Sequence, residues 1–250
     1  MTRRVASNSM GSVMTGQVKH GAATVVENIP FSFDEKEFQK LTHIDLSGPY
    51  AKAVAGLLEN ALAATRPKAL YKVCYIDNWT DDTVELEGIR FTSRVLSQNL
   101  SEVERVFPYI VTCGTELDKA LSAVTDVLAR YWLDGLKEMA LRTAVEHLKN
   151  HLVAEYGLKA EKLSTMNPGS GNKNVWPISQ QRQLFQLLGD VEGAVGVRLT
   201  DSFLMMPNKT VSGIFFPTEV NFVSCQLCTR ENCPRRRAEY TGSVDLAGYE

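Results

Sequence analysis

Three cysteines near the C-terminus are the residues whose type and spacing most directly indicate chemistry in this chain. Cys225, Cys228 and Cys233 give the spacings C-x2-C and C-x4-C, and Pro234 follows the last of them. Thiolates this close in sequence can converge on one thiophilic cation or on one iron–sulfur cluster. The pattern therefore predicts a metal centre held by these three residues, with either an iron–sulfur cluster or zinc as the cofactor.

Three thiolates leave the coordination shell one ligand short, so Cys74, Cys113, a histidine or an exogenous ligand must complete it. Arg230 and the run 235–237 surround the cluster, and positive charge lowers the pKa of a thiol and offsets the negative charge of a thiolate site. A redox-active dithiol or disulfide and a set of inert thiols are the alternatives. The sequence leaves the choice among iron–sulfur, zinc and disulfide open.

Other residues of metal-binding type are better interpreted as structural. His147 and His151 are four residues apart on an expected helix, but the HExxH pattern is absent. Histidine is also favoured at the C-terminal turns of helices by the helix dipole. Cys74 and Cys113 stand alone in apolar runs, and free cysteine in such runs usually behaves as a small core residue.

The composition limits which classes of protein this chain can belong to. Of its 250 residues 44% are hydrophobic and 22% charged, as in ordinary globular domains. With 27 Lys+Arg against 29 Asp+Glu there is no positive field for nucleic acid. No segment reaches the run of about 18 apolar residues that a membrane helix needs, and the opening residues lack the apolar core of a secretory signal. We therefore expect a cytoplasmic protein without nucleic-acid or membrane partners, and a mobile arm over residues 1–22.

Periodicity predicts an α+β fold, with a largely antiparallel sheet and flanking helices. The turn-rich NWTDD separates two apolar runs that we expect to be neighbouring strands. Thr115 is expected to cap the helix that begins there. The expected strands are 69–77, 83–91 and 105–114, and the expected helices are 50–65, 94–100, a helix from 115, 131–156 and 180–188. Two apolar runs around Pro207-Asn208-Lys209 predict a hairpin over residues 199–216.

The C-terminal third resembles a known family. LTDSFLMMPNKTVSGIFFP, residues 199–217, is similar to the hairpin of the activation (reactivation) domain of vitamin B12-dependent methionine synthase. In the preceding segment Asn167-Pro168-Gly169, Trp176-Pro177 and Gln180-Gln181 keep the spacing of that family's loop and helix. The resemblance extends over residues 45–220. It implies a free-standing family member with an activation-domain-like domain at 23–222 and a cysteine-rich tail at 223–250.

The family domain binds S-adenosylmethionine over a corrinoid, so the resemblance implies a binding loop at Thr165, Asn167, Pro168, Gly169 and Ser170. Thr165 stands where the family has an arginine that holds the carboxylate of the cofactor, and Ser170 replaces a family tyrosine. A charge-assisted bidentate contact is worth about 2 to 3 kcal/mol, and threonine cannot supply it. We therefore expect the loop 165–176 to border the principal pocket but to bind S-adenosylmethionine weakly or not at all.

The function that the resemblance implies is reductive reactivation of a corrinoid methyltransferase such as methionine synthase. The partner would carry the cobalamin, and this chain would be an accessory protein that passes an electron through the cysteine site. Two alternatives remain at this stage. One is a zinc-stabilised binding module without a redox role, and the other is an S-adenosylmethionine-binding methyltransferase component.

Overall fold

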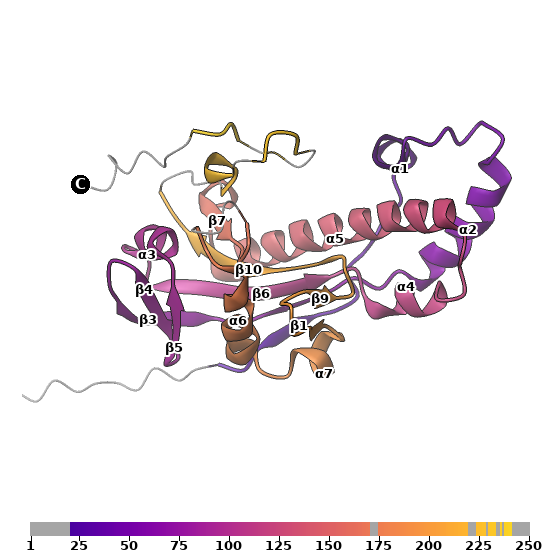
Figure 1. Ribbon diagram of the computed structural model, residues 1–250. Coiled ribbons are helices and arrows are strands. Elements are labelled where there is room, and N and C mark those ends of the chain that lie inside the picture. The colour runs from indigo at the N-terminus through magenta and orange to yellow at the C-terminus, as the bar shows by residue number, and fades with distance from the viewer. Residues whose placement is uncertain are drawn as a thin grey trace, which may run out of the picture.

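The structure is a computed structural model that describes residues 21–170, 175–219, 224–228, 230–233, 236 and 238–241 (Figure 1). The predicted arm at residues 1–22 lies almost entirely outside the described residues, as do Arg235 and Arg237 of the basic run. In the part that is described, no helix is long and apolar enough to cross a membrane.

A bent antiparallel sheet forms the centre of the molecule. Its middle strands are β6 and β10, which pair from Thr210 opposite Thr112 to Phe215 opposite Phe107. β6 also pairs with β2 and β3, and β10 pairs with β7 at its other edge. The strands of this sheet are β1 Thr24–Val26, β2 Lys68–Tyr71, β3 Cys74–Trp79, β4 Thr83–Leu86, β5 Ile89–Thr92, β6 Arg105–Thr112, β7 Leu163–Met166 and β10 Thr210–Pro217.

Helices cover both faces of the sheet. The long helix α5 lies along one face, while α6 and α7 lie on the other (Figure 1). The helices are α1 Glu35–Thr42, α2 Ala51–Ala64, α3 Arg94–Leu100, α4 Thr115–Ala120, α5 Val127–Tyr156, α6 Gln181–Leu188 and α7 Val191–Val195, with 3-10 turns η1 Ala160–Lys162, η2 Ile178–Gln180 and η3 Ser224–Leu227. The predicted α+β fold with a largely antiparallel sheet is confirmed.

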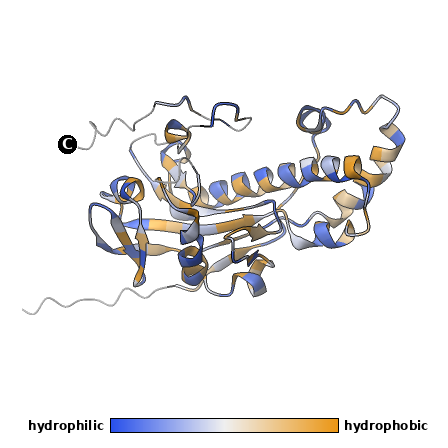
Figure 2. Cartoon of the chain, in the orientation of Figure 1, coloured by the Kyte–Doolittle hydropathy of each residue, from blue (hydrophilic) through white to orange (hydrophobic). Residues whose placement is uncertain are grey.

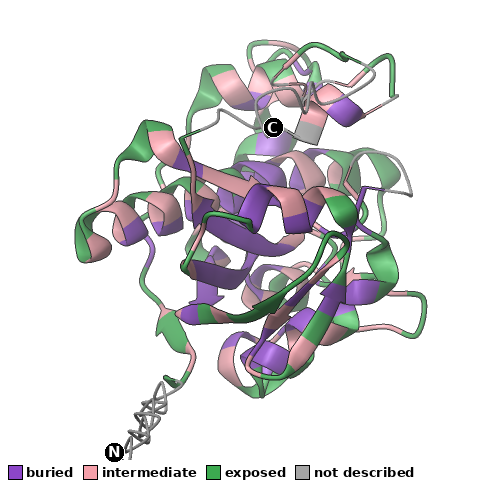
Figure 3. Ribbon diagram, turned by 90° about the vertical axis from the view of Figure 1, so that its left-hand side faces the viewer, coloured by how far each residue is buried: buried purple, intermediate pink, exposed green. Residues whose placement is uncertain are grey.

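Alternation along β6 divides the core between the two faces. Phe107, Tyr109 and Val111 point to the face covered by α5, whereas Val106 and Ile110 belong to clusters on the opposite face. Hydrophobic residues accordingly concentrate in the strands, and the buried residues gather around the sheet (Figures 2 and 3). A strand buried on both sides reads as a continuous apolar run, which is why 105–112 could be predicted as a strand.

Two strands that we predicted as single elements are each divided. The run 69–77 forms β2 and β3, which pair with successive parts of β6. The run 83–91 folds back on itself as the hairpin of β4 and β5. Glu87 and Gly88 have φ values of 50° and 74° at this turn, and two positive φ angles are what a two-residue hairpin connection requires.

The predicted hairpin over residues 199–216 is wrong. β9, Met205–Met206, pairs with β8, Arg198–Leu199, and not with the strand that follows Pro207. β10 instead inserts between β6 and β7, where residues 212–216 become buried. Pairing in the middle of the sheet buries both faces of this apolar run, which a two-stranded hairpin cannot do.

The predicted Thr115 cap is also wrong, because Gly114 occupies the N-cap position of α4. Gly114 has a φ of 94°, and a Cβ atom there would lie 2.2 Å from the carbonyl oxygen of Arg66. Only glycine fits this corner without strain. The chain therefore turns from β6 into α4 without a side-chain cap.

Candidate functional site

Thr165, the first residue of the predicted binding loop, lies on β7 and not in a loop. It stands opposite Phe215 on β10 and is half-buried. Its Oγ1 atom lies 3.0 Å from the hydroxyl of Tyr109, whose ring stacks on Phe215 with 4.3 Å between centroids. The side chain is therefore part of an ordered polar contact on the α5 side of the sheet.

Asn167 extends this contact into the loop. Its Nδ2 atom donates to the Tyr109 hydroxyl at 2.8 Å and to the carbonyl oxygen of Ser212 at 2.7 Å. Thr165, Tyr109 and Asn167 thus form one hydrogen-bonded network that ties the edge strand to β6 and β10. We call these three residues the β7 network.

The turn at Pro168, Gly169 and Ser170 closes the base of the loop. Pro168 is buried, and the Ser170 N–H donates to the carbonyl oxygen of Asn167 at 3.1 Å. The Gly169 N–H donates to the carbonyl oxygen of Trp176 at 2.8 Å, and its φ of 79° favours glycine. The structure brings all five predicted loop residues together, while residues 171–174 lie outside the described part.

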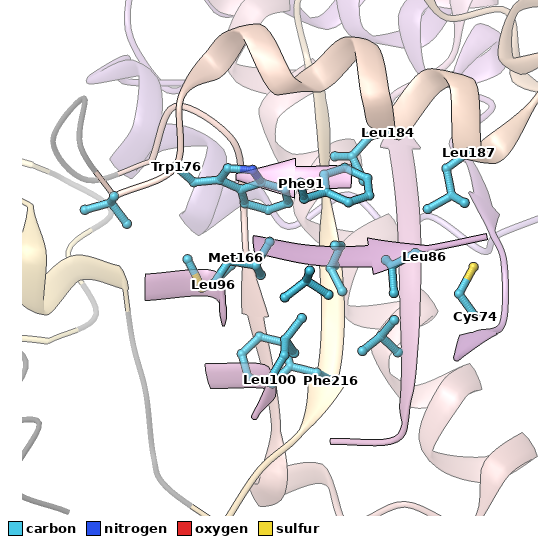
Figure 4. Close-up of a cluster of buried hydrophobic side chains, with 14 of the residues drawn as sticks. Cys74, Leu86, Phe91, Leu96, Leu100, Met166, Trp176, Leu184, Leu187 and Phe216 are labelled. Atoms are coloured by element: carbon cyan, nitrogen blue, oxygen red, sulfur yellow. The ribbon is translucent and has the colours of Figure 1, made fainter. Parts of the chain in front are cut away.

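Trp176 anchors the returning end of the loop in the core. It is fully buried against Phe91, and its Nε1 atom donates to Oε1 of Gln180 at 3.2 Å (Figure 4). The same oxygen accepts the backbone N–H of Thr92 at 2.8 Å. The Trp-Pro and Gln-Gln pairs noted in the sequence therefore fix the loop to strand β5.

The cysteine tail packs beside this loop. Cys225 lies in η3, and the next apolar residue, Leu227, is 8% exposed within the cluster that contains Met166 and Val175. The three tail cysteines are half-buried. Leu227 thus shares one hydrophobic cluster with Met166 and Val175, which stand on either side of the predicted binding loop.

The metal-binding role of Cys225, Cys228 and Cys233 stays a prediction. Over the described residues, no three His, Cys, Asp or Glu side chains gather as a ready metal site. The donor set nevertheless fits a thiophilic metal, since three cysteine side chains lie in one short segment.

Cys74 and Cys113 are core residues, as predicted. They are 1% and 0% exposed. Burial raises the pKa of the Cys113 thiol to about 12, and burial together with the carboxylate of Glu87 raises the pKa of Cys74. Both thiols are protonated at neutral pH, and metal ligation requires the thiolate.

The side chain of His151 on α5 contacts a tyrosine of the core. Its Nε2 atom lies 3.1 Å from the hydroxyl of Tyr71, which also lies 3.1 Å from the Tyr156 hydroxyl. This agrees with the structural interpretation of the histidine pair.

A pocket of about 850 Å³ lies between α1 and α5, and the described residues of the loop 165–176 do not line it. Since residues 171–174 lie outside the described part, the prediction that this loop borders the principal pocket stays a prediction. Glu138 is buried at the pocket between α1 and α5, 3.0 Å from Arg142 and 3.7 Å from Lys209. This carboxylate was not among the predicted site residues, although an acidic residue directly before Met139 on the apolar stripe of α5 was a visible signal.

Comparison with known proteins bears on the identity of the chain. A family model described as "Vitamin B12 dependent methionine synthase, activation domain" matches residues 118–237. No curated protein sequence matches the chain. The crystal structure of the MetH reactivation domain bound to AdoHcy is similar over 81% of this chain and 80% of that one, with a TM-score of 0.53 and 16% identity. Residues 118–237 of this chain thus match the activation-domain family of vitamin B12-dependent methionine synthase, and the chain shares the fold of the MetH reactivation domain.

Proposed function

We propose that this chain acts in trans on a corrinoid-binding methyltransferase, such as a methionine synthase, and supports the reductive reactivation of its cob(II)alamin. The single observation that carries the proposal is that Leu227 of the cysteine tail shares a buried hydrophobic cluster with Met166 and Val175, which stand on either side of the family loop. A surface that docks on the corrinoid and delivers an electron to it requires the family loop and the cysteine tail to lie side by side.

The tail supplies the chemical part of the proposal. An iron–sulfur centre held by Cys225, Cys228 and Cys233, reduced by an external low-potential donor, would supply the one electron that converts cob(II)alamin to cob(I)alamin. Leu227 keeps the cysteine tail on the core.

Anaerobic isolation followed by iron, zinc and sulfide analysis is the first test. The proposal expects iron and acid-labile sulfide, and it expects the chain to accelerate loss of the cob(II)alamin absorbance of a corrinoid protein in the presence of a reductant. A variant with all three tail cysteines replaced by serine is the matched control. Colourless protein with stoichiometric zinc and no effect on cob(II)alamin would contradict the proposal and favour the zinc-stabilised binding module.

The proposal also includes binding of the methyl donor, S-adenosylmethionine, at the β7 network. The structurally similar MetH domain was solved with AdoHcy, which supports an S-adenosyl ligand for this chain as well. Thr165, Asn167, Pro168, Gly169 and Ser170 are the proposed contacts. Thr165 is neutral and already engaged with Tyr109, so it offers no cation to a ligand carboxylate.

Thr165→Arg is expected to strengthen S-adenosylmethionine binding about tenfold, because one charge-assisted hydrogen bond is worth roughly 1.5–3 kcal/mol. Calorimetry on the two proteins checks this, with thermal unfolding to verify that loss of the Tyr109 contact leaves the fold intact. Ser179→Arg, which adds the same charge at an exposed position beyond the loop, is the control. Low micromolar binding by the parent chain would contradict the expected weakness.

A further inference from the structure

Arg236 is the residue that connects the three cysteines of the tail. Its Nη1 atom donates to the carbonyl oxygen of Cys225 at 3.3 Å, and its Nη2 atom donates to that of Cys228 at 3.4 Å. Its backbone N–H donates to the carbonyl oxygen of Cys233 at 3.1 Å. One half-buried residue therefore contacts the backbone of every proposed metal ligand.

The same guanidinium also gathers the chain on either side of the cysteines. Nη1 donates to the carbonyl oxygen of Ala238 at 3.4 Å, and Nη2 donates to that of Arg230. The backbone N–H of Thr241 donates to the carbonyl oxygen of Gln226 at 3.0 Å and closes the segment. The described residues between 224 and 241, which we call the cysteine segment, thus gather around Arg236.

Arginine is suited to this position because of the geometry of its donors. Its planar guanidinium offers five donors in a fixed arrangement, whereas lysine has three donors on one rotating ammonium group. One arginine can therefore hold several carbonyl groups at a fixed spacing.

We infer that Arg236 is the positioning residue of the cysteine site: its contacts with the backbone of Cys225, Cys228 and Cys233 set the spacing of the three proposed ligands. This inference rests on the proposed metal site and deepens it. The sequence has three consecutive arginines at 235–237. Nothing in the sequence around Arg236 marks it out from the other two.

The test measures zinc and cobalt binding to the full chain by chelator competition, and the absorption spectrum of the cobalt-bound chain. Arg236→Gln is expected to weaken metal binding by roughly 10–100-fold, as loss of groups that orient metal ligands does. It should also change the thiolate-to-cobalt absorption, because the ligands are no longer held at the same spacing. Arg236→Lys should recover only part of the metal affinity, because lysine cannot donate to several carbonyl groups in a fixed geometry.

Arg230→Gln is the matched control, because Arg230 is exposed in the same segment and takes part through its carbonyl oxygen. It should bind metal as the parent does. Equal binding by Arg236→Gln and the parent, or an equal loss in Arg230→Gln, would overturn the inference, as would a parent chain that binds neither metal. Circular dichroism checks that the domain is folded in each variant.

The outcomes separate this inference from the proposed function. Metal binding that depends on Arg236, in a chain without any effect on cob(II)alamin, would refute the proposed function and leave the inference standing. Reactivation that persists unchanged in Arg236→Gln, with its metal retained, would refute the inference alone.

Discussion

Replacement of any one of Cys225, Cys228 and Cys233 by serine is expected to remove most of the metal bound by the chain. Two remaining thiolates cannot satisfy the four-coordinate shell that zinc or iron demands, and metal affinity depends on the complete set of deprotonated ligands. The metal-to-protein ratio of anaerobically purified variants measures the effect. Cys113→Ala is the control, since this cysteine is fully buried in the core.

The domain should remain folded in these cysteine variants. Its core clusters lie on the sheet, and Leu227 is the residue of η3 that joins one of them. The thermal midpoint is therefore expected to change little in comparison with the metal content. A triple serine variant that keeps its full metal content would exclude shared ligation by these residues.

Gly213→Ala is expected to give the largest loss of stability among small substitutions at the β7 network. A Cβ atom at this position of β10 would lie 2.4 Å from the carbonyl oxygen of Met166 and 2.5 Å from Nδ2 of Asn167. The first neighbour is backbone of the paired strand, so β7 must move to relieve the overlap. Overpacking of this kind costs about 1–3 kcal/mol, and we expect a value near the upper end. Urea unfolding followed by tryptophan fluorescence measures it.

Gly56→Ala is the control for that substitution. Gly56 lies in α2, is exposed, and has no neighbouring atom within 4 Å of the added methyl group. Alanine in a helix is more stable than glycine by roughly 0.5–1 kcal/mol, so this variant should be stabilised. A Gly213→Ala protein as stable as the parent would show that β7 is not held as closely to β10 as the structure indicates.

Patterns within short stretches of the chain were enough to predict the local elements. Apolar spacing of three and four residues predicted the helices at 50–65 and 131–156, which the structure shows as α2, Ala51–Ala64, and α5, Val127–Tyr156. A continuous apolar run predicted the strand at 105–114, which is β6, Arg105–Thr112. The α+β class followed from their order. Asn167-Pro168-Gly169, Trp176-Pro177 and Gln180-Gln181 pointed to the correct family because short spacings are properties of the chain itself.

The tertiary structure decided which of these elements meet. β10 pairs with β6 and β7 and not with the neighbouring β9, because the central position buries more of its apolar surface. The contact of Leu227 with the cluster of Met166 and Val175 joins residues that no local pattern relates. The role of Arg236 depends on five carbonyl groups of the cysteine segment. Four accept hydrogen bonds from its guanidinium and one accepts from its backbone N–H. Which elements pair depends on burial and hydrogen bonding over the whole molecule. The spacing of residues in the sequence therefore cannot predict these partners.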